Sequence, residues 1–585
     1  MAFGYKNTKS FRLRTGLAVL MVLGAQLVFA QAARSSHTYE KFSADLAHVK
    51  PGTYLDVIVQ YGPIPTAEHY AKAAQLGGTT ITKLPSIRGA AFHLPAQALK
   101  HLAADPDVVY ISPDRPVKSL LSNAAPAVNA PYAWGLGYDG SGIGVAVVDS
   151  GISDHDDLKD SSGHNRIVYQ ADFASDGGTG DAFGHGEHVA GIIGGTGKDS
   201  TCSNCFAVIK GIAPKVTFIN LRALDKNGQG SDSSVINAIN KAIQLKNTYN
   251  IRVLNLSLGR PVFESYTQDP LCQAVESAWK AGIVVVVAAG NYGRDNSVGE
   301  QGYGTITAPG NDPYVITVGA MRTMGTPDRA DDLMASYSSK GPTGIDHILK
   351  PDLVAPGNVM TSLQVGATLE HSYPNNRPLL SSYQTGKTGY SDKYYVLSGT
   401  SMAAAVVSGG VADLLEAQPQ LTPDQVKARL MKTAYKIFPF SSSVTDPSTG
   451  TTYTDYYDAF TVGAGYLDLQ AALNNTDVVP NQISAKSLAV YYDSASHTVG
   501  FVYDASALWG NSAVWGNSAV WGNSAVWGNS AVWGNSAVWG NGNNTGFSAV
   551  WGNSAVWGNS AVWGNSAVWG NNTTEAMSIT INGDN

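Results

Sequence analysis

The feature that most constrains the fold is a series of short, valine-rich apolar runs between residues 142 and 318. The runs are continuous rather than alternating, and stretches with helical spacing separate several of them. Strands of this kind are typical of a parallel sheet covered by helices on both faces. The strand-like runs are Val145–Val148, Val216–Leu221, Val253–Leu256, Val284–Ala288 and Val315–Val318, with helical stretches such as Val235–Leu245 and Leu271–Lys280. We therefore expect residues 121–475 to form a doubly wound, mostly parallel α/β domain, with active groups at the carboxyl ends of its strands.

A smaller unit is predicted before this domain, within residues 31–120. Its strand-like segments are Leu55–Tyr61, Thr79–Lys83, Gly89–Leu94 and Val108–Ile111, and its helical segments are Thr66–Gln75 and Ala96–Ala104. The order βαββαβ over a core of residues 54–114 predicts a small ferredoxin-like α+β fold. A composition break rich in Ser, Asn, Ala and Pro follows in Ser119–Ala130.

Residues 1–30 have the pattern of a secretory signal peptide. Four basic residues precede an apolar run from Gly16 to Ala30, and Val28-Phe29-Ala30 places small residues where a signal peptidase cleaves. A membrane anchor is the alternative, but the run is shorter than the roughly 20 residues that a span needs. We therefore expect a secreted, extracellular protein, with retention at the cell surface as a variant of that expectation.

Charge and cysteine content exclude some classes of partner and scaffold. The net charge of −7 leaves no basic excess, so we expect no nucleic-acid partner. Three cysteines cannot form a disulfide framework. Cys202 and Cys205 suit a small local disulfide better than a metal site or a redox motif, because no further ligands follow and glycine and serine indicate a loop. Cys272 lies in a helical stretch, which predicts a buried free thiol.

Three segments carry residues suited to chemistry. Asp149 ends the first valine-rich run, where a buried carboxylate is costly unless it is paired. His185 and His188 lie in Gly-His-Gly-Glu-His-Val-Ala-Gly, which lacks the His-Glu-x-x-His pattern of zinc proteases, so we expect no metal there. Ser401 lies in Gly-Thr-Ser-Met-Ala at the start of a helical stretch, a position at which serine is most often only a cap.

The chain order Asp149, His185, Ser401 changes that interpretation, because a catalytic triad can occur in this order. With these motifs, and with Ala288-Ala289-Gly290-Asn291, residues 121–475 closely resemble the subtilisin-like serine proteases. The resemblance implies that Ser401 attacks the scissile carbonyl, that His185 transfers the proton and that Asp149 orients the imidazole. The implied function is a serine endopeptidase that works through an acyl-enzyme on protein or peptide substrates.

The resemblance also assigns an oxyanion donor and a substrate channel. It places the side-chain amide of Asn291, with the backbone N–H of Ser401, at the developing oxyanion. Ser257, Leu258 and Gly259 match the backbone segment that pairs with substrate as an added strand. Thr307 is a weaker match to the family's pocket for the substrate side chain before the cleaved bond. We expect this pocket to prefer apolar substrate side chains. No cofactor is required for this chemistry.

The sequence departs from the family pattern at Glu187, where threonine is usual, and at Ala405, where proline is usual. We expect Glu187 to face solvent, with an effect on the basicity of the two histidines as the alternative. Asp157 matches a calcium ligand of some family members, but the partner loop is replaced by an insertion at Gly197–Phe206. Structural calcium therefore stays an open alternative.

The family resemblance gives residues 31–120 a role as well. Family members carry a propeptide of this βαββαβ type, which assists folding and inhibits the enzyme until it is cut off. A template is useful because long-range pairing in a large parallel sheet is slow. The implied protein is a zymogen that cuts itself within Pro116–Ala125 and begins, once mature, near Asn123.

A tryptophan repeat follows a short β segment predicted in residues 476–508, with strands at Leu488–Tyr492 and Thr498–Tyr503. Residues 509–571 repeat Trp-Gly-Asn-Ser-Ala-Val, and residues 572–585 come after them. A period of six suits extended strands better than one helical face. The alternatives are a repeat without fixed structure and an adhesive module that contacts a polymer or a cell surface. The competing hypothesis is a binding protein: a subtilisin-like scaffold without catalytic activity, in which the repeat binds the partner.

Overall fold

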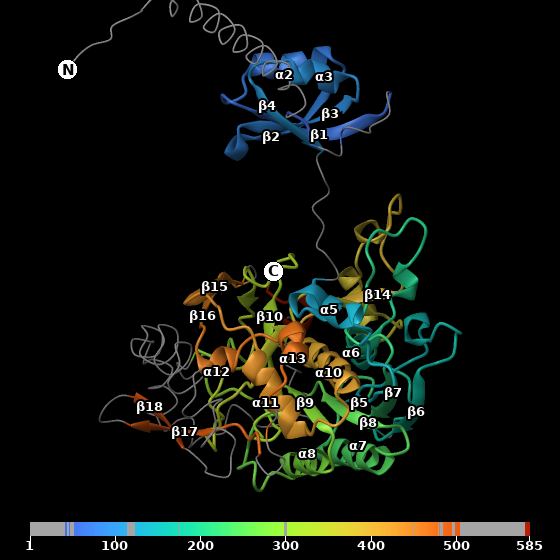
Figure 1. The fold of residues 1–585 in the computed structure, drawn as a ribbon, viewed down its shortest axis with the longest axis vertical. Coiled ribbons are helices and arrows are strands. Elements are labelled where there is room, and N and C mark those ends of the chain that lie inside the picture. Colours follow the sequence, from blue (N-terminus) through green and yellow to red (C-terminus); the bar gives the residue numbers. More distant parts are fainter. Residues whose placement is uncertain are drawn as a thin grey trace, which may run out of the picture. The chain divides into compact units, whose positions relative to one another are not determined.

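The computed structural model describes residues 41–43, 46, 52–113, 123–174, 176–297, 301–446, 449–477, 479, 484–493, 498–502 and 579–584. The expected signal peptide and the tryptophan repeat lie outside these residues. The chain divides into two compact units, residues 1–118 and residues 119–585, which are drawn together in Figure 1 and described separately here. None of the helices that the structure describes is long and apolar enough to cross a membrane.

The described residues of the first unit form a four-stranded sheet and two α-helices. Its elements are β1 (Tyr54–Tyr61), α2 (Ala67–Gln75), β2 (Thr79–Leu84), β3 (Gly89–Pro95), α3 (Ala98–Ala103) and β4 (Val108–Pro113). The strands pair antiparallel in the order β2-β3-β1-β4, and Val57, Phe92 and Ile111 are among the side chains of its core. The order of helices and strands is the one that the sequence predicts.

The second unit is an α/β domain around an eight-stranded sheet. The strands are β5 (Gly144–Asp149), β6 (Ile167–Asp172), β7 (Thr217–Arg222), β8 (Ile251–Leu256), β9 (Val284–Ala288), β10 (Ile316–Arg322), β11 (Leu333–Met334) and β12 (Leu353–Pro356). They run in the order β11-β10-β9-β8-β5-β7-β6, with β12 beside β10, and all pairs are parallel except β10 with β11. Each of the five predicted valine-rich runs overlaps one of these strands, although Val216 and Val315 lie one residue before β7 and β10.

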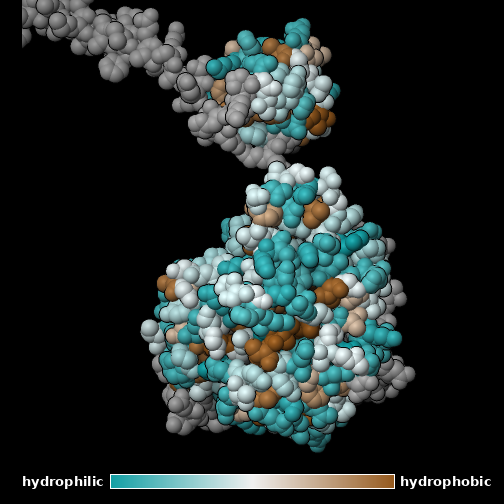
Figure 2. Space-filling view, turned by 90° about the vertical axis from the view of Figure 1, so that its right-hand side faces the viewer, coloured by the Kyte–Doolittle hydropathy of each residue, from teal (hydrophilic) through white to brown (hydrophobic). Residues whose placement is uncertain are grey.

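Two pairs of helices cover this sheet. Helices α6 (His185–Gly194) and α10 (Thr400–Ala417) pack on each other, with α6 against β5 and α10 against β8, β9 and β10. Helices α7 (Asp232–Leu245) and α8 (Pro270–Lys280) form the second pair, and Figure 1 shows labelled strands between the two pairs. On the face shown in Figure 2, hydrophilic residues cover most of the described surface, since the valine-rich strands are buried.

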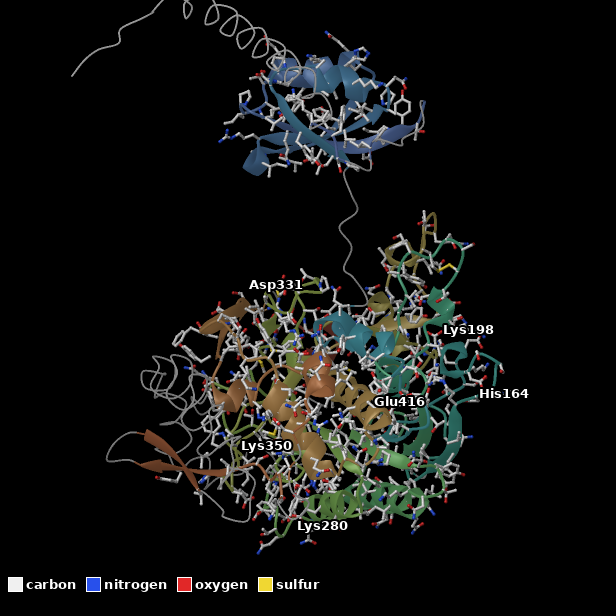
Figure 3. The ribbon with its side chains drawn as sticks, viewed as in Figure 1. His164, Lys198, Lys280, Asp331, Lys350 and Glu416 are labelled. Atoms are coloured by element: carbon white, nitrogen blue, oxygen red, sulfur yellow. A yellow bond between two sulfur atoms is a disulfide. The ribbon has the colours of Figure 1, made fainter. Side chains whose placement is uncertain are left out.

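The remaining elements of the second unit are short. They are α4 (Ala124–Ala127), α5 (Ala130–Gly135), β13 (Met360–Leu363), α9 (Thr368–Ser372), β14 (Tyr394–Leu397), α11 (Pro423–Thr433), β15 (Ser441–Thr445), β16 (Thr452–Tyr456), α12 (Ala459–Val462), α13 (Leu469–Asn474), β17 (Ala489–Asp493) and β18 (Thr498–Val502), with 3-10 turns at residues 156–158, 198–200, 374–376 and 380–382. A further 3-10 turn, at residues 85–87, belongs to the first unit. Strands β17 and β18 form an antiparallel hairpin, as predicted for this segment. Cys202 and Cys205 are joined by a disulfide, visible in Figure 3, and Cys272 is a buried free thiol.

Candidate active site

Asp149 lies at the carboxyl end of β5 and is 1% exposed. Its Oδ1 accepts a hydrogen bond from Nδ1 of His185 at 2.7 Å and one from the backbone N–H of Ser150 at 2.8 Å. The Oγ of Ser150 in turn accepts from the N–H of Gly186 at 2.9 Å, which ties the strand end to α6. A buried carboxylate is thus held against an imidazole, as the desolvation argument requires.

His185 is the first residue of α6, and the preceding loop fixes the helix start. Gly184 has φ +105°, a left-handed conformation that glycine adopts easily. The carboxylate of Asp181 accepts from the N–H groups of Phe183, Gly184 and Glu187 at 3.0, 2.7 and 2.8 Å. Asp181 therefore caps the helix and positions His185. The sequence analysis missed this residue, although an acid just before a helix is a usual capping signal.

Glu187 does not face solvent, and that prediction was wrong. Its side chain is 0% exposed, and its Oε2 accepts from the backbone N–H of Ser153 at 2.6 Å. Burial raises the pKa of Glu187 well above its usual value, and the nearby carboxylates of Asp181 and Glu370 add to the rise. The family's small threonine is thus replaced by an acid that joins α6 to the loop after β5.

His188 lies behind His185 on α6 and has a structural role. Its Nε2 donates to the backbone oxygens of Met360 at 3.0 Å and Tyr395 at 3.2 Å. Complete burial lowers the pKa of His188 to about 3, so the ring stays neutral. These bonds connect α6 to β13 and β14.

Ser401 is the second residue of α10 and is 5% exposed. Its Oγ donates to the backbone oxygen of Ser257 at 3.1 Å, and the Oγ of Ser257 donates to the backbone oxygen of Ser401 at 2.8 Å. The reciprocal bonds hold the end of β8 against the first turn of α10. Helix α10, which bears Ser401 in its first turn, packs on α6, which begins at His185.

The amide of Asn291, which follows β9 closely, has a defined orientation. Its Oδ1 accepts from the N–H of Thr400 at 2.9 Å and from the Oγ1 of Thr400 at 3.0 Å. Because both partners are donors, the oxygen must face Thr400 and the Nδ2 donor must face away. A side chain at Gly399 would put its Cβ 3.1 Å from that Nδ2, so glycine leaves room at the amide.

One pocket collects these groups with the predicted substrate segment. It is lined by Ser257, Leu258, Gly259, Ala288, Gly290, Asn291, Tyr292, Thr307, Thr400 and Ser401. No residue of this lining carries a charge. A Cβ on Gly259 would lie 2.5 Å from the Oγ1 of Thr307, so the segment and the pocket wall fit only with glycine there. The structure therefore brings Ser401, Asn291 and residues 257–259 together.

A group of potential metal ligands, none of which lines the pocket, fits calcium poorly. Ligand atoms of His155, Asp157 and Asp199 lie within 4.8 Å of one another. The two carboxylate oxygens of Asp157 already accept from the N–H of Asp199 at 2.8 Å and from the hydroxyl of Tyr394 at 2.9 Å. The Nδ1 of His155 accepts from the N–H of Asp157 at 3.1 Å. Calcium needs six to eight oxygen ligands, which this nitrogen-containing, hydrogen-bonded set does not offer.

On this α/β sheet the structure places a buried carboxylate–imidazole pair, a serine in the first turn of a helix and an oriented amide, which are the kinds of group that a serine-type hydrolase uses. Comparison with known proteins agrees: residues 140–465 match the subtilase family. Serine protease AprX of Bacillus subtilis is 37% identical over 55% of this chain and 68% of its own length. Subtilisin E of Bacillus subtilis is 30% identical over 70% and 93%, and the extracellular serine proteinase of Thermus sp. is 33% identical over 61% and 73%.

The chain belongs to the subtilase family. It is a serine-type endopeptidase with a Ser/His/Asp triad, as the sequence analysis predicts.

Proposed function

We propose that Asp149, His185 and Ser401 are the triad of this endopeptidase and that Asn291 is its oxyanion donor. The observation that carries the assignment is the 2.7 Å bond between Asp149 and Nδ1 of His185, the first residue of α6. Helix α6 packs on α10, the helix that bears Ser401 in its first turn. With Nδ1 donating to the carboxylate, Nε2 is the nitrogen that can accept a proton.

In the proposed reaction, the Ser401 hydroxyl leaves the oxygen of Ser257 and gives its proton to Nε2 of His185 as Oγ attacks the substrate carbonyl. The imidazolium that forms is stabilised by Asp149 and then protonates the leaving amine, which leaves an acyl-enzyme. Water, deprotonated by the same imidazole, hydrolyses the ester and restores Ser401. In the structure the Ser401 hydroxyl donates to the backbone oxygen of Ser257. This bond is compatible with a nucleophilic role, because catalytic hydrogen bonds often form fully only when substrate is bound.

Charge that develops on the carbonyl oxygen is stabilised by two donors. The orientation of Asn291 supports Nδ2 as one, and the backbone N–H of Ser401, in the first turn of α10, is the other. Ser257, Leu258 and Gly259 would pair with the substrate backbone as an added strand. The uncharged pocket lining supports a preference for apolar side chains before the cleaved bond.

The finer biology is part of the same proposal. The chain is exported by residues 1–30, folds with residues 31–120 as propeptide and inhibitor, and cuts itself within Pro116–Ala125. The antiparallel βαββαβ unit supports the propeptide assignment. Mass spectrometry of secreted protein would give the mature start, expected near Asn123. A mature species that retains residues 54–113 would contradict this processing.

The tryptophan repeat is proposed as the part that retains the active protease at a polymer or cell surface. Its lack of charge between residues 505 and 574 and its many tryptophans support adhesion through indole rings. Deleting these residues should release the enzyme from the surface without changing peptide hydrolysis. Unchanged retention would refute this function.

The catalytic assignment is tested by peptide hydrolysis with the full chain. Ser401→Ala should lower kcat by about 10⁶-fold, because the nucleophile is lost. Ser277→Ala, an exposed serine on α8, is the matched control and should keep full activity. Substantial hydrolysis by the Ser401 variant would overturn the assignment. The proposed chemistry needs no cofactor, so chelators should not affect the acylation step.

A further inference from the structure

Residues 579–584, which follow the tryptophan repeat, form a short segment buried in the second unit. Ile579 and Ile581 are 2% and 7% exposed and belong to the main hydrophobic core. Asp584 is 3% exposed. We name residues 579–584 the clamp segment. An apolar and acidic segment at such depth must be held by specific partners, because a buried charge is costly without them.

The first set of partners lies in the turn that leads to the nucleophile. The backbone N–H of Ser398 donates to the backbone oxygen of Thr580 at 2.9 Å. Ser398 begins the Ser-Gly-Thr-Ser sequence that ends in Ser401. Gly583 has φ +62°, and a Cβ there would lie 2.4 Å from the Oγ of Ser398 and 2.4 Å from the Oδ1 of Asn358. The clamp segment is therefore in close contact with the backbone just before the nucleophile.

The second set of partners lies in the loop that bears the oxyanion donor. Nη2 of Arg294 donates to Oδ1 of Asp584 at 2.5 Å, and both side chains are buried. Arg294 lies three residues after Asn291 in Asn-Tyr-Gly-Arg. Ser336 completes the cluster: its N–H donates to Oδ2 of Asp584 at 2.6 Å and its Oγ to Oδ1 at 2.7 Å. Both oxygens of Asp584 are thus occupied.

Asn358 joins the two sets of contacts. Its Oδ1 accepts from the N–H of Asp584 at 2.8 Å, and its Nδ2 donates to the backbone oxygen of Asp584 at 3.3 Å. The neighbouring N–H of Val359 donates to Oγ of Ser398 at 2.9 Å, and the N–H of Gly399 donates to the oxygen of Gly357 at 2.9 Å. The turn before Ser401 and the segment around Asp584 therefore share one hydrogen-bonded support.

We propose that the clamp segment holds the turn bearing Ser401 and the loop bearing Asn291 in register, so that Asp584 and Arg294 are positioning residues for catalysis. This inference rests on the proposed roles of Ser401 and Asn291. The physical reason is that the oxyanion donor and the nucleophile act on the same carbonyl. A small shift of one relative to the other lowers the rate of attack more than it lowers substrate binding.

The covalent order of the chain gives the clamp segment a second consequence. The segment before the repeat is also attached to the second unit, since Leu349 N–H donates to the oxygen of Leu488 at 2.8 Å and Val490 N–H to the oxygen of His347 at 2.9 Å. The repeat therefore joins two anchored segments. A chain cut inside the repeat would keep the clamp segment through its buried contacts rather than through the backbone.

The test uses the full chain with Asp584→Asn, which keeps the side-chain shape but removes the charge that pairs with Arg294. Active sites are first counted by titration with a fluorophosphonate, and kcat and KM are then measured per titrated site with a peptide substrate. We expect kcat to fall about tenfold with KM within about twofold, because positioning is lost and binding is kept. Asp477→Asn, which loses a surface pair with Lys432, should change neither.

Gly583→Ala gives an independent test that leaves all charges in place. Its Cβ would push on Ser398, so we expect the same fall in kcat at similar KM. A purely structural role predicts the opposite result: a lower melting temperature with unchanged kcat per titrated site in both variants, which would overturn the proposal. If the unmodified enzyme is not labelled by the fluorophosphonate at all, the proposed catalytic function fails instead, so the two failures are distinct.

Discussion

Two buried charged clusters of the second unit differ in how completely their hydrogen bonds are used. Around Asp352, both carboxylate oxygens are occupied: Oδ2 accepts from Lys350 at 2.7 Å, and Oδ1 accepts from Ser487 at 2.5 Å and pairs with Lys427 at 3.1 Å. Figure 3 labels Lys350 within the unit. At Asp149, Oδ1 takes the donors, while Oδ2 has no hydrogen-bond partner among the residues that the structure describes.

With the proposed roles, the difference separates a cluster that stabilises the fold from one that does chemistry. A cluster in which every polar atom has a hydrogen-bond partner has one stable arrangement. Burial opposes ionisation of Asp352, but the attraction of Lys350 and Lys427 is stronger and lowers its pKa. Among the described residues, the proposed catalytic cluster leaves one oxygen of Asp149 without a partner, and the Ser401 hydroxyl donates to the backbone oxygen of Ser257. Buried polar groups without a full set of partners are unusual and mark positions where function outweighs stability.

The comparison predicts its largest effect at Asp149. Asp149→Asn should lower kcat by about 10⁴-fold, because an amide no longer holds the imidazole in the tautomer that accepts a proton at Nε2. The measurement is kcat with a peptide substrate beside the melting temperature, which should change little. A variant that keeps activity within about tenfold would show that the carboxylate does not orient His185.

A smaller effect on rate is expected at Asn291. Asn291→Ala should lower kcat by about 10²–10³-fold with little change in KM, the loss known for removing one such donor from a subtilisin. Steady-state kinetics check this. A change confined to KM would make Asn291 a binding residue instead.

The fully hydrogen-bonded cluster around Asp352 should lose stability rather than activity when it is changed. Asp352→Asn leaves Lys350 and Lys427 buried without their counter-charge and should cost about 3–5 kcal/mol of unfolding free energy. Denaturant unfolding measures that loss, with the surface variant Asp477→Asn as control. Activity per folded molecule should be retained, and a large fall in kcat per titrated active site would contradict the separation of the two clusters.

The smallest effect concerns Glu187 and depends on pH. Burial raises its pKa in the folded state, so between the unfolded pKa and the folded pKa the folded protein keeps a proton that the unfolded chain releases. Stability therefore falls as pH rises through this window. Glu187→Gln removes this pH-dependent loss of stability. From about pH 5 upward, the melting temperature of the variant should therefore rise above that of the unmodified enzyme by an amount that grows with pH. Glu264→Gln, a partly exposed acid of the second unit, should show no such trend, and a constant difference for Glu187→Gln would refute the buried proton.

Most of the sheet could be predicted because buried parallel strands have a direct sequence signal. Strand β6 could not, since it lies at the sheet edge and its exposure alternates between half-buried and exposed. The family was recognisable from the local motifs around Asp149, His185 and Ser401, whose individual roles stay a proposal. Glu187 was misjudged because an acid in the first turn of a helix usually faces solvent, and only packing against Ser153 reveals its burial. The contact between Arg294 and Asp584 joins residues 290 apart, a separation that no local pattern encodes.

The measurement that tests the central claim most directly is covalent labelling of the processed, secreted enzyme with a fluorophosphonate, followed by peptide mapping. Our account predicts one modified residue, Ser401, no labelling of Ser401→Ala, and much slower labelling of Asp149→Asn. Labelling at another serine, or an unmodified Ser401 in protein that hydrolyses peptides, would contradict it.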